Sequence, residues 1–147
     1  MAIYQHILLA VDFFQQDELV IDKAKNLALL HKAHLSIVHV VDNLPIYDIG
    51  YGENMLFNLD LAAELMEIAK QKLAELALKL QVTDDDVFLE MGCPKLQIVK
   101  VAQENNVDLI VLGSHGRHGL ALLLGSTANG VLHYAACDVL AVRLADN

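Results

Sequence analysis

The sequence has few cysteines, few basic residues and no tryptophan. Its two cysteines, Cys93 and Cys137, form no CxxC pair, so the sequence indicates neither a disulfide framework nor a zinc knuckle. Ten basic residues against nineteen acidic ones give a net charge of −9. Proteins that bind nucleic acids or anionic membranes depend on clustered cations, so this balance argues against both kinds of partner.

Long hydrophobic runs are absent as well. The apolar runs at residues 7–11 and 120–124 are far shorter than the ~18 residues of a membrane span, and no basic segment precedes the first. We therefore expect no membrane anchor, no targeting segment and a cytoplasmic location. Apolar residues make up 55% of the chain, which excludes a disordered protein, and 147 residues suit one domain over 1–147.

Short apolar segments alternate with segments of helical periodicity along the chain. The predicted strands lie at residues 7–11, 35–41, 87–91, 108–112 and 138–144. The predicted helices lie at 17–32, 58–80, 94–105 and 126–136, with Asn58 as the N-cap of the second and an irregular segment at 43–57 before it. This alternation predicts a single Rossmann-like α/β domain, in which helices cover both faces of a five-stranded parallel sheet.

The ends of two predicted strands carry suggestive residues. In open parallel sheets, ligands bind beyond the carboxyl ends of the strands, where the strand order reverses. If the order is 3-2-1-4-5, the reversal falls between the first and fourth strands, which end at Asp12 and Gly113. We predict that these two residues lie close together. Asp12 would then contact a ligand or cap the following turn.

A glycine-rich segment follows the fourth strand: GSHG at 113–116, then eight residues, then GST at 125–127. Glycine lets a backbone approach a ligand closely, and the free N–H groups of a helix start bind phosphate. Ser126 would add a hydroxyl donor or cap the helix. The alternative interpretation is ordinary turn chemistry.

Other polar residues give weaker signals. His115, Arg117 and His118 would place positive charge beside phosphates, and because no third ligand is apparent near the two histidines we predict no metal site. We interpret His39 as a satisfied core residue and the acidic run at 84–86 as a solvated turn. The sequence shows no paired carboxylates and no supported Ser/His/Asp grouping, so we predict that the protein is not an enzyme.

The segments ILLAVD at 7–12, SIVHVVD at 36–42, VDLIVLGSHG at 107–116 and GS at 125–126 together resemble the universal stress protein family. The resemblance implies the strand order 3-2-1-4-5, cytoplasmic dimers, a role in the stress response and, in one subgroup, binding of ATP or AMP. Asp12 would lie beside the adenosine, and the backbone of Val40 would meet the adenine. The remaining nucleotide-binding positions would be Gly113, Gly116, Arg117, Gly125, Ser126 and Thr127.

The glycine spacing departs from that subgroup. Its pattern is Gly-x2-Gly-x9-Gly-Ser/Thr, whereas this chain has eight residues between Gly116 and Gly125. A second subgroup, like universal stress protein A, lacks the glycines and does not bind ATP, so this chain is intermediate. Two functions stay open: a small dimeric regulatory protein that binds ATP or AMP, with or without Mg²⁺, and a dimeric interaction module with a vestigial pocket. Slow ATP hydrolysis would be incidental.

The last predicted strand, 138–144, would lie at an edge of the sheet and is apolar on both faces. Unpaired N–H and C=O groups on such an edge favour pairing with another chain. We predict a two-fold antiparallel contact that buries Val139, Leu140 and Val142, as the family resemblance also implies. The alternative is a monomer whose edge is shielded by the irregular segment at 43–57.

Overall fold

A computed structural model of the chain describes residues 3–13, 17–42, 53–114 and 124–144, without the side chains of 53–59. Its elements in chain order are β1 (His6–Ala10), α1 (Asp17–His31), β2 (His34–Asp42), α2 (Glu53–Leu80), the 3-10 turn η2 (Asp84–Asp86), β3 (Val87–Gly92), α3 (Pro94–Glu104), β4 (Leu109–Gly113), α4 (Ser126–Tyr134) and β5 (Asp138–Val142). No helix among these described residues is long and apolar enough to cross a membrane.

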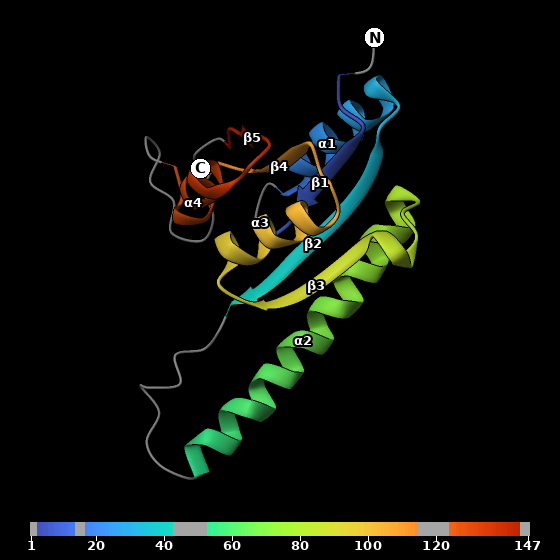
Figure 1. Cartoon of the computed structure of the whole chain (residues 1–147). Helices are drawn as coiled ribbons and strands as arrows, with labels where there is room; N and C mark the ends of the chain where they lie inside the picture. The colour runs from blue at the N-terminus through green and yellow to red at the C-terminus, as the bar shows by residue number, and fades with distance from the viewer. Residues whose placement is uncertain (1–2, 14–16, 43–52, 115–123, 145–147) are drawn as a thin grey trace.

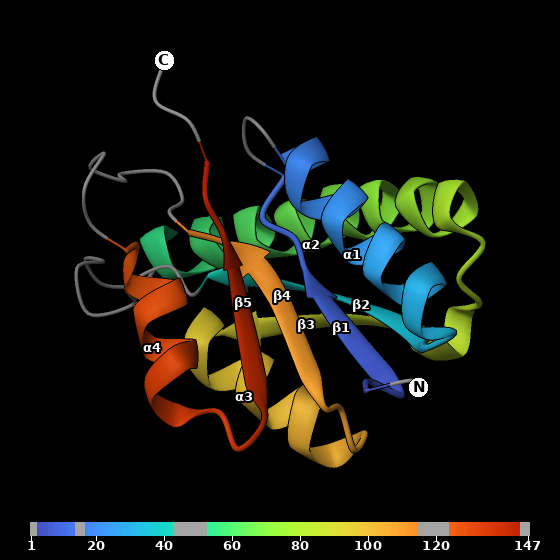
Figure 2. The ribbon, with the colours of Figure 1, turned by 90° about the horizontal axis from the view of Figure 1, so that it is seen from above.

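The five strands form one parallel sheet in the order β3-β2-β1-β4-β5 (Figure 1). Helices α1 and α2 cover one face, and α3 and α4 cover the other (Figure 2). The predicted α/β fold and strand order are therefore confirmed. Strand β1 lies between β2 and β4, so the carboxyl ends of β1 and β4 meet at the point where the strand order reverses.

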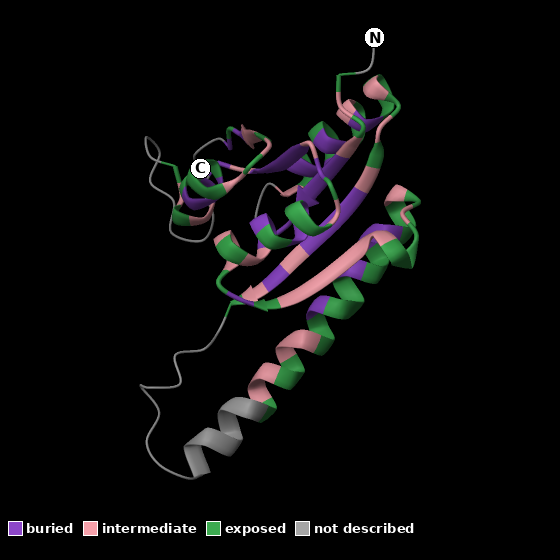
Figure 3. Ribbon diagram, viewed as in Figure 1, coloured by how far each residue is buried: buried purple, intermediate pink, exposed green. Residues whose placement is uncertain are grey.

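The alternation of side chains along β1 divides the core into two layers. Ile7 and Leu9 pack with α1 and α2, whereas Leu8 and Ala10 pack with α3 and α4. Ile7, Leu8 and Leu9 have no exposed surface, and the central strands are the most deeply buried part of the sheet (Figure 3). Each such side chain contributes about 1.5–3 kcal/mol by its burial, so the centre of the sheet is rigid support for the loops at its two ends.

Three predicted boundaries are wrong by two residues or more. Helix α2 begins at Glu53, ahead of the expected N-cap Asn58, because residues 53–57 (ENMLF) include good helix formers that continue the helix backwards. Helix α4 ends at Tyr134 and strand β5 at Val142, each before the predicted end. Helix and strand ends fray, and periodicity alone places them loosely. Of the irregular segment predicted at 43–57, residues 43–52 lie outside the described part of the chain.

Helices α3 and α4 approach each other closely at Gly130. A Cβ atom at this position would lie 2.4 Å from Cδ of Lys95 and 2.8 Å from its Cβ. Real atoms do not come so near, so the absence of a side chain at Gly130 permits the observed spacing of the two helices. That spacing fixes where the amino end of α4 lies relative to the sheet.

Candidate functional site

The two ends of the glycine-rich segment meet at Ser114. The N–H of Gly125 donates a hydrogen bond to the carbonyl oxygen of Ser114 at 2.7 Å. Ser114 also donates its own N–H to the carbonyl oxygen of Val142 at 2.8 Å, and its Oγ accepts the N–H of Leu144 at 3.2 Å. The end of β4, the start of α4 and the end of β5 are therefore joined at one buried residue.

Helix α4 presents its amino end at this carboxyl edge. Gly125 occupies the N-cap position with φ −63° and ψ 160°, and Ser126 is the first helical residue. Ser126 is thus not the cap, so of its two predicted roles only that of a hydroxyl donor remains. Its side chain is exposed, and that of Thr127 is half-buried. The first amides of a helix have no partner within the helix and carry partial positive charge, so they favour an anion here.

Asp12 follows β1 at the same edge. Leu9 of β1 pairs with Val111 of β4, so Asp12 comes level with Ser114, next to Gly113 as predicted. Asp12 is exposed. The turn that follows β1 is held by another acid, since Oδ2 of Asp17 accepts the N–H of Phe13 at 2.6 Å. Phe13 itself has a φ of 63°, a conformation that bulky residues rarely adopt, so this bond stabilises a strained turn.

The carboxyl groups of Asp12 and Asp17 form a pair that the sequence analysis missed. Burial and then the neighbouring carboxylate of Asp12 raise the pKa of Asp17 to about 7. Two carboxylates so close cannot both ionise without repulsion, so the pair retains a proton up to near-neutral pH. The prediction of no paired carboxylates was wrong because Asp12 and Asp17 are five positions apart in the sequence, a spacing that does not by itself indicate contact.

His39 connects the end of β1 to β2. Its Nδ1–H donates to the carbonyl oxygen of Val11 at 2.6 Å, and its ring lies 4.7 Å from that of Phe13. Lys72 of α2 places Nζ 5.6 Å from the centre of the Phe13 ring. Burial lowers the pKa of His39, so the ring is neutral at pH 7. His39 has the partner that was predicted, but it is half-buried rather than a full core residue.

Val40 faces the same edge with its backbone. The carbonyl oxygen of Val38 accepts the N–H of Val11 at 3.0 Å, so Val38 points its peptide groups toward β1. Alternate residues of a strand share this direction. The peptide groups of Val40 therefore face the space beyond the end of β1, while its side chain is buried in the core.

A known family matches this chain over almost its whole length. The model of the universal stress protein family matches residues 3–143. The chain belongs to the universal stress protein family.

Individual relatives agree with this assignment. "Universal stress protein A homolog 2" of Coxiella burnetii is 42% identical over 142 residues, which are 96% of either chain. Among solved structures, that of the hypothetical protein MJ0577 superposes with a TM-score of 0.79 at 29% identity, over 98% of this chain and 99% of that one. A universal stress protein solved in complex with cAMP superposes with a TM-score of 0.58 at 26% identity, over 95% of this chain and 96% of that one.

The structure of this universal stress protein describes all the predicted nucleotide positions except Gly116 and Arg117, which lie outside the described residues together with His115 and His118. The described positions come from three strand ends and one helix start, and all of them lie at the carboxyl edge of the sheet. They are Asp12, Val40, Gly113, Gly125, Ser126 and Thr127.

Proposed function

We propose that this universal stress protein is a small regulatory protein that binds an adenine nucleotide at the carboxyl edge, between β1 and β4. The observation that carries the proposal is the 2.7 Å hydrogen bond from Gly125 N–H to Ser114 O. It brings the amino end of α4 beside the end of β4, next to β1 and the Asp12 that follows it. A nucleotide needs a binding site for its phosphates and another for its base, no farther apart than the length of the nucleotide. This edge has candidate residues for both.

Each candidate residue then has a role. The phosphates would lie on the amides of Gly113, Ser126 and Thr127, close to the backbone of Gly125, whose own N–H is bonded to Ser114, with Gly116 and Arg117 completing this end of the site. The carboxylate of Asp12 would accept hydrogen bonds from the ribose hydroxyls, and the peptide groups of Val40 would face the adenine. ATP and AMP are the expected ligands, and the solved complex of a relative with cAMP supports an adenine nucleotide as the class.

The short glycine spacing bears on this proposal. The eight residues between Gly116 and Gly125 are one fewer than in the nucleotide-binding pattern. The Gly125 to Ser114 hydrogen bond nevertheless forms, so the shorter segment is compatible with a closed geometry at its two ends. The competing proposal is an interaction module with a vestigial pocket, and nucleotide binding distinguishes the two.

Calorimetry with ATP, ADP, AMP and cAMP tests the proposal. We expect binding by the unaltered protein and a loss of about tenfold or more in Asp12→Ala, since a charge-assisted hydrogen bond contributes about 1.5–3 kcal/mol. Asp22→Ala, which removes an exposed acid from α1, is the matched control and leaves binding unchanged. The absence of heat at millimolar nucleotide would refute the nucleotide site and favour the interaction module.

The protein would bind nucleotide without turning it over efficiently. Hydrolysis needs a positioned base or a metal-activated water, and the carboxyl pair of Asp12 and Asp17 lies at the proposed adenosine end rather than at the phosphates. Slow ATP hydrolysis would be incidental. Turnover at ordinary enzymatic rates that survives repurification and disappears in Asp12→Ala would contradict this part of the proposal.

We also propose a homodimer formed through strand β5. This strand pairs with β4 on one side and lies at the edge of the sheet. Val139 and Leu140 are half-buried, whereas Val142 is only 9% exposed and already belongs to the core, so Val139 and Leu140 are the side chains that the contact would bury. Beside the strand, a groove of about 500 Å³ between α1 and β5 leaves apolar surface for a second copy to cover.

Two proline variants test the dimer. The carbonyl oxygen of Val142 accepts the N–H of Ser114, so Val142 points toward β4 and Ala141 points toward the open edge. Ala141→Pro removes a donor from that edge and should yield a folded monomer in sedimentation experiments. Val142→Pro, by contrast, should destabilise the fold itself. A monomeric unaltered protein at micromolar concentration would refute the dimer.

A further inference from the structure

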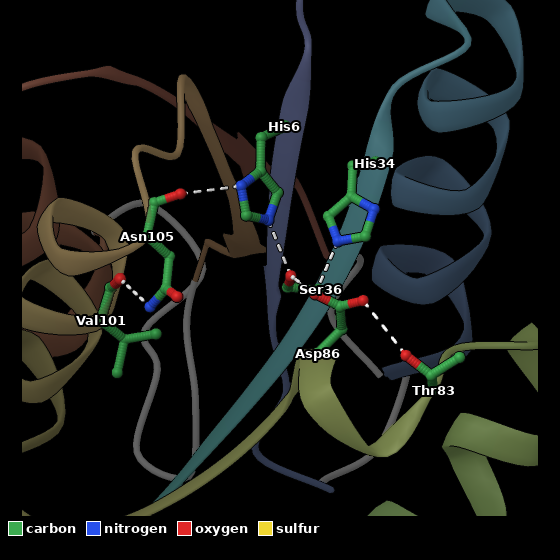
Figure 4. Close-up of polar contacts among 7 residues, drawn as sticks. All are labelled: His6, His34, Ser36, Thr83, Asp86, Val101 and Asn105. Carbon is green, nitrogen blue, oxygen red and sulfur yellow. Dashed lines mark hydrogen bonds and ion pairs between the residues drawn. The ribbon is translucent and has the colours of Figure 1, made fainter.

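A second cluster of polar side chains lies at the opposite edge of the sheet, where three neighbouring strands begin (Figure 4). His6 is the first residue of β1, His34 is the first residue of β2, and Asp86 directly precedes β3. His6 and His34 are cross-strand partners, and the centres of their rings are 4.8 Å apart. The proposed nucleotide site has no part in this cluster.

The contacts within the cluster are short. Nε2 of His34 lies 2.6 Å from Oδ1 of Asp86. Oγ of Ser36 lies 3.1 Å from the same oxygen and 2.7 Å from Nε2 of His6. One ring nitrogen from each histidine and one carboxylate oxygen of Asp86 all lie within 4.8 Å of one another. Two imidazoles and a carboxylate are a common ligand set for zinc and similar divalent ions.

The ring of His6 is oriented by its two neighbours. Nδ1 of His6 lies 3.0 Å from the carbonyl oxygen of Asn105, which only accepts, so Nδ1 carries a proton. The other ring nitrogen, Nε2, faces the buried hydroxyl of Ser36. This hydroxyl lies between Nε2 of His6 and the carboxylate of Asp86, so it holds two of the candidate ligand atoms near one another.

We propose that the cluster binds a divalent transition-metal ion, with Zn²⁺ as the expected occupant, through Nε2 of His6, Nε2 of His34 and the carboxylate of Asp86. The ion replaces the proton on Nε2 of His34, which moves to Nδ1 or to solvent. Ligands of tetrahedral zinc lie roughly 3.3 Å apart, as expected for metal–ligand distances near 2.0 Å. The three ligand atoms, now within 4.8 Å of one another, would reach this spacing by rotation of their side chains.

The surroundings of the cluster suit a metal. The side chain of His34 is 55% exposed, which gives an ion an entry path and leaves room for a water ligand. Metal-bound histidines almost always donate their second ring N–H to a carbonyl or carboxylate oxygen, as His6 does to Asn105. Asp86 is held in the same way, since Oγ1 of Thr83 donates to its Oδ2 at 3.4 Å.

An ion pair between His34 and Asp86 is the simpler alternative. It would explain their 2.6 Å contact, but it does not involve His6, whose ring offers a ligand atom within 4.8 Å of the other two. The two interpretations differ in their dependence on added metal. An ion pair needs none, whereas a metal site changes the thermal stability and the spectrum of the protein when metal is added.

Titration of the full-length, chelator-treated protein with Zn²⁺ in a calorimeter, and with Co²⁺ in a spectrophotometer, tests the proposal. We expect one ion per chain, visible absorption of low-symmetry Co²⁺ and a higher melting temperature with Zn²⁺. His34→Gln and Asp86→Asn should each weaken zinc binding by at least about 100-fold, because loss of even an outer-shell partner costs 10–100-fold. Both keep hydrogen-bonding groups, and circular dichroism confirms their fold.

His133→Gln is the matched control, since this exposed histidine of α4 lies outside the cluster. Its zinc affinity should equal that of the unaltered protein. A double variant His115→Gln and His118→Gln addresses the other histidine pair in the sequence. Zinc binding that survives in His34→Gln and Asp86→Asn, or that disappears only in the double variant, would overturn the proposal. The absence of zinc binding at micromolar concentrations would overturn it too.

Discussion

The two edges of the same sheet are built from different parts of the chain. At the carboxyl edge, the chemistry lies mostly in the backbone: the amides at the start of α4, the peptide groups of Val40 and the joint at Ser114. At the amino edge it lies in the side chains of His6, His34 and Asp86, which three separate segments contribute. Backbone sites follow from local sequence, because glycine and helix starts are adjacent along the chain. Side-chain clusters follow from strand register, which is not visible in a linear pattern.

The largest difference between the edges is expected at Gly125. We predict that Gly125→Val weakens nucleotide binding by about 100-fold, or about 2.8 kcal/mol, because a side chain there blocks the approach of a phosphate to the amides of α4. Its φ of −63° and ψ of 160° suit any residue, so the fold should keep its stability. Calorimetry with ATP and chemical denaturation measure the two effects. Unchanged affinity would show that the phosphates do not lie on α4, while zinc binding at the amino edge should be unaffected.

At the amino edge, removal of Ser36 should lower the stability of the fold, whereas Gly125→Val should lower nucleotide affinity and leave stability unchanged. Ser36→Ala removes the contact that Nε2 of His6 makes with the hydroxyl, whereas Oδ1 of Asp86 keeps its contact with His34. A buried polar group without a partner costs about 1–3 kcal/mol, so we expect a loss of that size in the free energy of unfolding. Ser126→Ala, at an exposed position of the carboxyl edge, is the control and should change stability by under about 0.5 kcal/mol. Equal losses in the two variants would contradict the contrast between the edges.

A smaller effect is expected from pH at the carboxyl edge. The pKa of Asp17 is about 7 in the folded protein, above its ordinary value of 3.8. The folded state therefore holds a proton that the unfolded state has lost between about pH 4 and pH 7, and this carboxyl contribution to stability falls as the pH rises through that range. Asp17→Asn removes the dependence and keeps the acceptor for Phe13 N–H.

We expect a gain in stability of about 1 kcal/mol for Asp17→Asn above pH 7 and almost none at pH 4, a modest value because water screens a side chain that is only partly buried. Denaturation at a series of pH values measures it. Asp22→Asn, on the exposed face of the same helix, should leave the pH profile unchanged. A parallel profile for Asp17→Asn and the unaltered protein would show that the carboxyl pair does not share a proton.

Much of the fold was predictable from the sequence, because burial imposes a pattern that local residues reveal. The run from Ile7 to Val11 is apolar at every position, as a strand covered on both faces must be, and the strand order was confirmed. The start of α2 was not predictable, because Asn58 resembles a cap yet the residues before it are good helix formers. A cap preference of about 1 kcal/mol does not end a helix that its neighbours extend.

The candidate sites were predictable to different extents, because strand order brings some of their residues together and the path of a turn brings others together. Asp12 follows β1 and Gly113 ends the neighbouring β4, so the strand order alone brought them together. The Asp12 and Asp17 pair needed the path of the turn at Phe13, which its positive φ determines. Asp86 was taken as part of a solvated turn, but it is half-buried and bonded to His34 and Ser36, whereas Asp84 and Asp85 are exposed. The signal available beforehand was a histidine at the first position of two adjacent strands.

Ser114 is common to the phosphate end of the proposed nucleotide site and to the edge strand of the proposed dimer. Its carbonyl oxygen accepts a hydrogen bond from Gly125, and its N–H donates one to Val142. Ser114 is therefore hydrogen-bonded both to the N-cap of α4 and to β5. Linkage between two binding events is reciprocal. If pairing of β5 with a second chain shifts Ser114, this pairing changes the affinity of the protein for nucleotide. Nucleotide binding then changes the affinity between the two chains by the same factor. In such a protein, the adenine nucleotide is an allosteric effector of assembly, and the proportion of paired chains reports its concentration.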